Sequence, residues 1–322
     1  MRAAAAVPRD NECMRRRTFL GTLAARSFAK QPARIDAEWY RRSRRFASLP
    51  AAEVAYVEHG RGPAALFLHG FPLNGLQWRG ALERLRPYRR CIAPDLMSLG
   101  FTQAREGQDI TPDTQVSMLV SLLDRLRVDT VDLVANDSGG LVAQLFIARH
   151  PARVRTVLLT NCDVDENNPP AKFLPAVTLG KNGMFTERYV VPQLQEKGLA
   201  RSAKGIGSAF TDPERLSDET LEMYFRPLIA TPLRKAQLDR YTVSLGENVL
   251  VAIREDLRKW RGSARMVWGL KDAFFGVEWA EWLDRTLPGS HGVRRVENAN
   301  LFFPEEMPDL IAEEGKALWG IG

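Results

Sequence analysis

Cysteine is scarce in this chain, with 3 among 322 residues. Three cysteines cannot form a disulfide framework, and no Cys and His residues stand at the spacing of a zinc site. Uninterrupted apolar runs are short, and none approaches the roughly 18 residues of a transmembrane helix. Glycine and proline, at 24 and 19 residues, are too few for a collagen-like or low-complexity chain. With 45% hydrophobic residues, the chain is long enough to bury a large core in one or two domains.

An excess of positive charge is also absent from most of the chain, although the formal net charge is +6. Residues 1–45 contain 12 Lys and Arg against 4 Asp and Glu, whereas the remaining residues contain 33 against 35. The basic excess therefore belongs to an N-terminal segment, and the rest of the chain is nearly neutral. Since proteins that bind nucleic acid present a basic face, we expect no nucleic-acid partner.

The N-terminal segment, which we assign to residues 1–46, contains a short motif of its own. The run Arg16-Arg17-Thr18-Phe19-Leu20 resembles a twin-arginine export signal. The apolar stretch that follows ends at Arg26, and a signal peptide needs about 7–15 apolar residues there. Two interpretations stay open: a periplasmic or secreted protein if this segment acts as a twin-arginine signal, or a protein of the bacterial cytoplasm with a basic extension.

From residue 52 onward, short β-branched and apolar runs alternate with stretches of helical periodicity. This alternation is typical of a parallel sheet covered by helices on both faces. Between residues 170 and 258 the helical periodicity continues without any strand pattern. We therefore predict an α/β fold with a doubly wound, mostly parallel sheet in residues 47–168 and 259–322, and a helical cap in residues 169–258. The predicted strands are 54–58, 64–68, 91–94, 131–135, 154–160, 265–268 and 293–296.

One predicted strand runs directly into a helix through the turn Ala135-Asn136-Asp137-Ser138-Gly139-Gly140. Small residues two positions before and two and three after Asp137 allow the strand and helix backbones to approach closely. Such a turn raises the central side chain above the sheet and points the helix N-terminus at it. If Ser138 were central instead, Asn136 would occupy a position that requires a small residue. An ordinary strand-to-helix turn with an Asp near its cap is the alternative for this segment alone.

With three other segments, this turn resembles the α/β-hydrolase superfamily over about residues 47–318. These segments are His69-Gly70-Phe71-Pro72, the loop 94–100 and the run 267–272 that ends in Asp272. The turn around Asp137 resembles the nucleophile elbow of this superfamily. An Asp at its centre is similar to the arrangement in epoxide hydrolases and haloalkane dehalogenases, and the segment His-Gly-Phe-Pro fits the epoxide hydrolases better. A dehalogenase places a halide-binding Trp where this chain has Ser138.

The resemblance implies specific roles. Asp137 is the nucleophile that forms an ester with a substrate carbon, Asp272 is the acid of the triad, and the backbone N–H groups of Phe71 and Ser138 form the oxyanion hole. We expect no cofactor and no metal, a monomer or homodimer, and a small apolar substrate. Among the tyrosines of the predicted cap, Tyr224 is the preferred candidate for protonating a leaving oxygen. The predicted substrate-binding residues are His69, Trp78, Tyr189, Tyr224 and Phe302.

The sequence departs from the family at the base of the triad. In the segment Ala299–Pro308, the residue that corresponds to the catalytic His is Leu301, and Leu cannot accept a proton. Three interpretations remain. The first is a hydrolase with an altered mechanism, in which Asp137 acts as nucleophile or as base. The others are an inactive protein that binds a small ligand, and a cofactor-free non-hydrolytic enzyme. With simple epoxides or haloalkanes we expect at most one turnover.

Overall fold

The computed structural model describes residues 1, 3 and 35–321, so the twin-arginine motif lies outside the described residues. A nine-stranded sheet forms the centre of the described chain, in the order β1-β2-β4-β3-β6-β7-β8-β9 with β5 paired to β2. From β4 to β9 neighbouring strands are parallel, and β2 is antiparallel to its neighbours. The strands are β1 (Arg45–Ser48), β2 (Ala52–His59), β3 (Ala64–Leu68), β4 (Arg90–Pro94), β5 (Gln103–Ala104), β6 (Val131–Asp137), β7 (Val154–Cys162), β8 (Ser263–Gly269) and β9 (Ser290–Val296).

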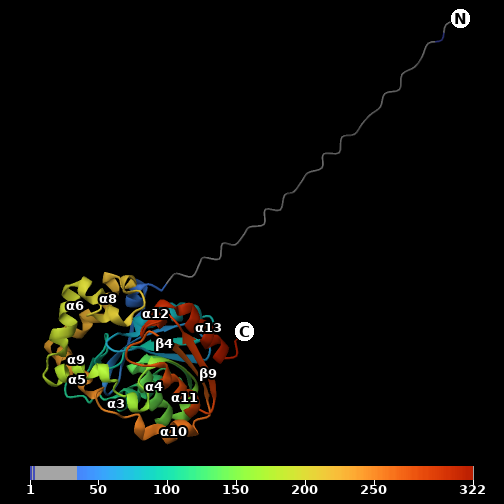
Figure 1. The fold of residues 1–322 in the computed structure, drawn as a ribbon. Helices are drawn as coiled ribbons and strands as arrows, with labels where there is room; N and C mark the ends of the chain where they lie inside the picture. The colour runs from blue at the N-terminus through green and yellow to red at the C-terminus, as the bar shows by residue number, and fades with distance from the viewer. Residues whose placement is uncertain (2, 4–34, 322) are drawn as a thin grey trace. The chain divides into compact units, whose positions relative to one another are not determined.

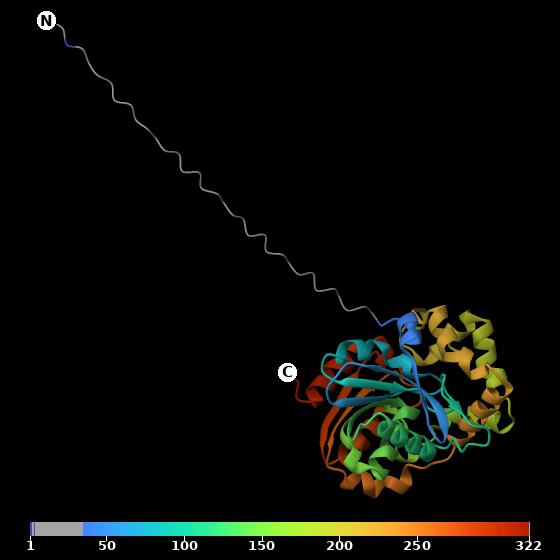
Figure 2. The ribbon, with the colours of Figure 1, turned by 180° about the vertical axis from the view of Figure 1, so that it is seen from behind.

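The central strands are buried on both faces. Every residue of β3 and β6 is buried, because helices cover the sheet on either side. One layer contains α2 (Arg79–Leu85) and α13 (Pro308–Leu318), which contact each other. The other contains α3 (Pro112–Arg125), α4 (Ser138–Arg149) and α11 (Val277–Thr286) (Figures 1 and 2). This is the predicted α/β class, and the apolar runs of the sequence became strands because parallel strands need apolar side chains on both faces.

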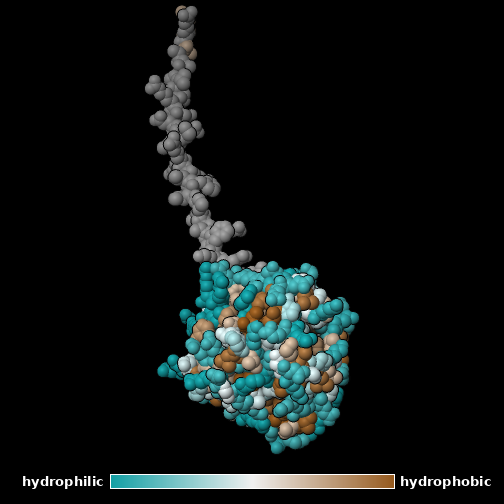
Figure 3. Space-filling model, turned by 90° about the vertical axis from the view of Figure 1, so that its left-hand side faces the viewer, coloured by the Kyte–Doolittle hydropathy of each residue, from teal (hydrophilic) through white to brown (hydrophobic). Residues whose placement is uncertain are grey.

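The segment between Pro169 and Lys259, described throughout, contains helices and no strand. Its principal helices are α5 (Leu174–Lys181), α6 (Val191–Gln195), α7 (Lys197–Arg201), α8 (Asp218–Phe225) and α9 (Pro232–Ser244), which lie together beside the sheet domain (Figure 1). We call residues 169–250 the cap. The expected cap extended to residue 258, but α10 (Arg254–Lys259) packs against α4 in the sheet domain. Figure 3 shows apolar groups scattered among hydrophilic ones on the cap side, as is usual for a protein surface.

The fold begins earlier than the predicted boundary at residue 46. Asp36 caps helix α1 (Ala37–Ser43) by accepting a hydrogen bond from Trp39 N at 2.7 Å. Ile35 and Tyr40 are each 2% exposed, and β1 pairs with β2 from Arg45 onward. The expectation that residues 35–46 belong to an extension outside the fold is therefore wrong. A basic composition concealed the two buried side chains that anchor this segment.

A partly buried polar cluster connects the cap to the sheet domain. Arg79 Nη1 lies 2.5 Å from Glu305 Oε1, and the Tyr224 hydroxyl from α8 donates a hydrogen bond to Glu305 Oε2 at 2.6 Å. Because the half-buried charges of Arg79 and Glu305 are paired, this cluster avoids the cost of an unpaired ion partly removed from water. We call these three residues the Glu305 cluster. No helix within the described residues is long and apolar enough to cross a membrane.

Candidate active site

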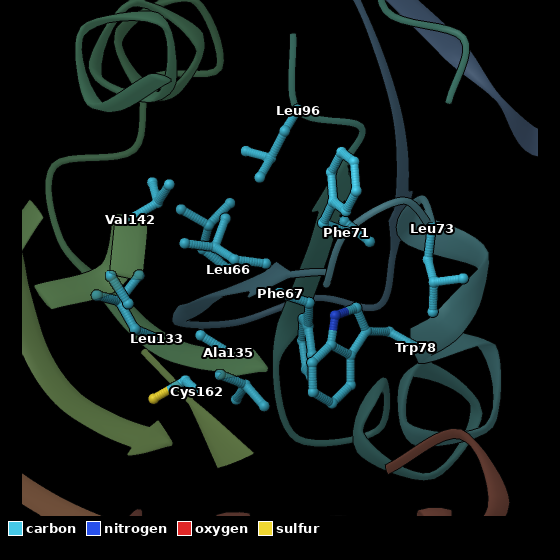
Figure 4. Packing of buried hydrophobic residues seen from close by; sticks show 14 of the residues in the cluster. Leu66, Phe67, Phe71, Leu73, Trp78, Leu96, Leu133, Ala135, Val142 and Cys162 are labelled. Carbon is cyan, nitrogen blue, oxygen red and sulfur yellow. The ribbon is translucent and has the colours of Figure 1, made fainter. Parts of the chain in front are cut away.

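The strand-to-helix elbow at Asp137 is the central feature of the site. Asp137 has φ 53° and ψ −132°, a left-handed region that costs a residue with a side chain about 1–3 kcal/mol. A Cβ at Gly139 would collide with the backbone of Leu68, and one at Gly140 would collide with Cys162. Figure 4 shows Ala135 and Cys162 among the buried side chains of the core. The small residues of the motif are therefore required by the close approach of the backbones.

The carboxylate of Asp137 is held by backbone N–H groups. Phe71 N donates a hydrogen bond to Asp137 Oδ2 at 2.6 Å, and the N–H of Ser138 also faces the carboxylate. Residue 70 must be glycine, because a Cβ there would lie 2.8 Å from Asp137 Oδ2 and 2.7 Å from Phe302 Cε1. The structure thus brings Asp137, Phe71, Ser138 and Phe302 together at the carboxyl ends of the central strands.

Above the elbow lies a cavity of about 280 Å³ between the cap and the sheet domain. Its lining is mostly apolar and rich in aromatic rings, and a lysine from the cap stands on it. This composition suits a small apolar molecule with one or two polar contacts. The lining includes Phe71, Asp137, Ser138, Asp163, Lys172, Phe185, Tyr189, Leu301 and Phe302.

Asp163 is a cavity residue that the sequence analysis missed. Strands β6 and β7 pair so that Asp137 is opposite Cys162, and Asp163 is the next residue of the chain. Its side chain is 6% exposed and lines the same cavity as Asp137. Asn168 Nδ2 donates to Asp163 Oδ1 at 3.2 Å. The sequence could have indicated Asp163, because an Asp that directly follows a buried strand beside the elbow strand must lie near the elbow.

Burial raises the pKa of both carboxyl groups in the cavity. The pKa of Asp137 lies well above its ordinary value, first because burial disfavours its charge and then because Asp163 is near; the N–H groups of Phe71 and Ser138 oppose this. Burial raises the pKa of Asp163 from 3.8 to about 7, against the hydrogen bond from Asn168. Asp163 therefore changes its protonation near neutral pH.

Asp272 lies behind the cavity wall, held by its own hydrogen bonds. Phe274 N donates to Oδ1 at 2.8 Å, and Asn161 Nδ2 donates to Oδ2 at 2.9 Å. Desolvation outweighs these donors and raises the pKa of Asp272 to about 6. The residue follows β8, where the resemblance expected the triad acid, but no imidazole stands before it.

Leu301 occupies the expected position of the catalytic histidine, with its side chain 4% exposed on the cavity. Its carbonyl oxygen accepts a hydrogen bond from Asn136 Nδ2 at 3.1 Å, and Phe302 N donates to Ala209 O in the cap at 2.9 Å. All four histidines of the chain are within the described residues, and none of them lines the cavity. No cluster of His, Cys, Asp or Glu in the described part of the chain is arranged to hold a metal ion.

Three predicted substrate-binding residues, Trp78, His69 and Tyr224, do not line the cavity. Trp78 is fully buried against Phe67, with ring centroids 5.8 Å apart, and does not reach the cavity (Figure 4). His69 is also fully buried: its Nδ1 is 3.0 Å from Gly70 O, and its Nε2 accepts from Leu96 N at 3.0 Å. These two bonds fix a neutral ring, and burial lowers the pKa of His69. Both side chains are structural.

The prediction for Tyr224 is wrong as well, because its hydroxyl belongs to the Glu305 cluster and its ring is fully buried outside the cavity wall. Of the predicted cap tyrosines, Tyr189 lines the cavity, stacked on Phe185 with ring centroids 5.2 Å apart. Burial raises the pKa of Tyr189 to about 12, so its hydroxyl keeps its proton at neutral pH.

Replacing Asp163 tests whether its carboxyl is buried as described. The folded protein holds a proton on Asp163 up to about pH 7, whereas the unfolded chain releases it near pH 3.8. The free energy of unfolding should therefore fall between these pH values, by about 3–4 kcal/mol from this group. We expect Asp163→Asn to flatten this part of the stability curve and to stabilise the protein at pH 8. The measurement is urea unfolding of wild type and Asp163→Asn from pH 4 to 8, with the exposed Asp256→Asn as the control. The same dependence of unfolding free energy on pH in all three proteins would contradict the burial of the Asp163 carboxyl.

Comparisons with known proteins agree with this geometry. A model of the alpha/beta hydrolase family matches residues 65–314. The chain is 36% identical over 148 residues to epoxide hydrolase 2 of Siraitia grosvenorii, a match that spans 45% of this chain and 46% of that protein, about half its length. It is 25% identical over 285 residues to haloalkane dehalogenase 2 of Mycobacterium tuberculosis, spanning 86% and 93%.

A solved structure of a haloalkane dehalogenase from Bradyrhizobium elkani superposes with a TM-score of 0.70 and 22% identity, covering 87% of this chain and 98% of that one. That level of identity shows a shared fold. The family model covers most of the chain, and the fold agrees with it. The chain belongs to the alpha/beta hydrolase family, with epoxide hydrolases and haloalkane dehalogenases among its relatives.

Proposed function

We propose that this protein is a hydrolase of the epoxide hydrolase and haloalkane dehalogenase type, which uses Asp137 as its nucleophile on a small apolar substrate. The observation that carries the proposal is the position of Asp137 at the elbow, with one oxygen held by backbone N–H and the cavity above it. Relatives with these two activities support the same assignment.

The two oxygens of Asp137 have different surroundings, which suits a nucleophile. Oδ2 accepts the hydrogen bond from Phe71, so Oδ1 is the oxygen available to a substrate carbon. Attack by Oδ1 forms the ester and expels a halide or opens an epoxide ring. When water later adds to the ester, the negative charge develops on Oδ2, where the N–H groups of Phe71 and Ser138 stabilise it.

The cavity lining gives the substrate its chemical character. The rings of Phe71, Phe185 and Phe302 offer apolar contacts, whereas a strongly polar substrate would lose its hydration there without compensation. Tyr189 supplies a hydroxyl that keeps its proton, and we assign it to the leaving oxygen or halide in place of Tyr224.

A protein that only binds a small apolar ligand is the second candidate. The observation in its favour is Leu301, together with the position of every histidine outside the cavity. The two candidates differ in one property, since only a hydrolase forms a covalent bond to Asp137.

A single turnover in ¹⁸O-labelled water tests the proposed function. We expect excess protein to convert 1-bromobutane or 1,2-epoxyhexane so that the product takes its oxygen from Asp137, and the label then enters the peptide that contains Asp137. The Asp137→Asn variant should form no ester under the same conditions, which intact-protein mass spectrometry reports. Label that appears directly in the first product would contradict a nucleophilic Asp137. Binding of either compound with neither ester nor product would favour the second candidate.

Placing histidine at position 301 tests whether the backbone of this loop runs as it does in the families that the sequence resembles. Asn136 and Ala209 hold the backbone of residues 301 and 302, so a side chain at position 301 should enter the cavity. We expect Leu301→His to raise the steady-state rate on 1-bromobutane by at least about tenfold, since a positioned base contributes about 10²–10⁴-fold. Leu301→Gln is the control, because its side chain is polar but accepts no proton. An equal steady-state rate for both variants would show that a side chain at position 301 does not reach the ester on Asp137.

A further inference from the structure

We propose that Asp163 is the general base that completes turnover in this protein, by activating the water that cleaves the ester on Asp137. The inference rests on the proposed function, since it requires that ester. It replaces the expectation from the sequence that turnover stops after one event, because that expectation considered only histidine as a base.

Strand register places Asp163 beside the reacting group. Asp137 and Cys162 are opposite each other on the parallel strands β6 and β7, which lie about 4.8 Å apart. Cys162 meets Gly140 on the helix side of the elbow. Asp163 directly follows the end of β7, and its side chain lines the same cavity as Asp137.

The hydrogen bonds of Asp163 leave one of its oxygens available. Oδ1 accepts from Asn168, the carboxylate also faces its own backbone N–H, and no other residue within 35–321 donates to it. Asp272, by contrast, has a donor on each oxygen and does not line the cavity. Of the two carboxyl groups near Asp137, Asp163 is therefore the one that can take a proton from a water in the cavity.

The step balances with water alone. A water oxygen bonds to the carbonyl carbon of the Asp137 ester while one of its protons passes to Asp163 Oδ2. The tetrahedral intermediate then collapses: the bond between the carbonyl carbon and the alkyl oxygen breaks, and its electron pair leaves on that oxygen, which takes the proton back from Asp163. The alcohol departs, Asp137 remains as a carboxylic acid, and its proton is lost to solvent. Asp163 begins and ends the step as a carboxylate.

The groups that face Asp163 determine its pH response. Asp137 and Asp272 are acidic neighbours, Tyr241 of α9 and the Cys162 thiol are neutral ones whose pKa values burial raises, and Lys172 stands on the same cavity wall. With a pKa of about 7, Asp163 becomes a carboxylate within the range where a base is effective. Release of product should therefore accelerate as the pH rises through about 7.

Comparing ester formation with ester cleavage tests the inference. With 1-bromobutane we expect wild-type protein to complete many turnovers, with a rate that rises through pH 7. Asp163→Asn should form the ester at least as fast, because removing a neighbouring charge favours ionised Asp137. It should release butanol about 100-fold more slowly or worse, so that the ester accumulates, and the pH dependence of release should disappear. Asp163→Glu should recover part of the rate, and Asp256→Asn is the surface control.

Other outcomes overturn the inference in distinguishable ways. If Asp163→Asn turns over as fast as wild type, or if the wild-type ester is as persistent as that of the variant, Asp163 is not the base. If no protein forms an ester and none releases butanol or 1,2-hexanediol, the proposed function itself fails. Thermal unfolding of each variant shows whether it is folded, and stability at or above that of wild type is expected for Asp163→Asn at pH 8.

Discussion

The hydrogen bond from Phe71 N to Asp137 Oδ2 is the contact on which the site depends. It exists because two loops meet without side chains between them. Gly70 leaves room for the carboxylate, and Gly139 and Gly140 allow the elbow to press against β3 and β7. The positive φ of Asp137 is the cost of this approach. A strained backbone at the carboxyl end of a parallel sheet is a common location for chemistry, since the rigid strands hold the strain in place.

A chain of buried amides holds the loop at Leu301, where the resemblance expected a histidine, in place beside the elbow. Gly70 N donates to Gln77 Oε1 at 2.9 Å, and Gln77 Nε2 donates to Asn136 Oδ1 at 2.7 Å. Asn136 in turn donates to the carbonyl oxygens of Asn161 and Leu301, each at 3.1 Å. The loop at residue 301 is thus fixed by bonds to its backbone, which do not depend on its side chain. Replacement of an imidazole by Leu leaves such a network intact.

A leucine at position 301 gives the site different electrostatics from those that the resemblance implies. The resemblance implies an imidazole between Asp137 and Asp272, whereas here Leu301 occupies that position and Asp163 lies on the cavity with Asp137. Burial raises the pKa values of all three carboxyl groups, and repulsion from neighbouring carboxylates adds to this for Asp137 and Asp163. Asp163, with a pKa of about 7, changes its protonation near neutral pH. A carboxyl group with a raised pKa has the property that a base needs, which an ordinary surface Asp lacks.

Sequence patterns predicted what local constraints determine. The strand Ala64–Leu68 and the elbow around Asp137 were visible because apolar runs and small residues are dictated by their immediate surroundings. The directions of side chains could not be predicted from the sequence. Tyr224 contacts Glu305, and Trp78 contacts Phe67, and neither partner is a near neighbour in the sequence of the residue it contacts. Asp163 was missed because its importance comes from its register against β6.

A crystal structure of Asp163→Asn after exposure to 1-bromobutane would test the central claim, a nucleophilic Asp137, most directly. The account predicts continuous electron density from Asp137 Oδ1 into a butyl chain within the aromatic part of the cavity, with Oδ2 still accepting from the N–H of Phe71. An unmodified Asp137 beneath a bound but unreacted molecule, or a butyl group on any other side chain, would contradict it.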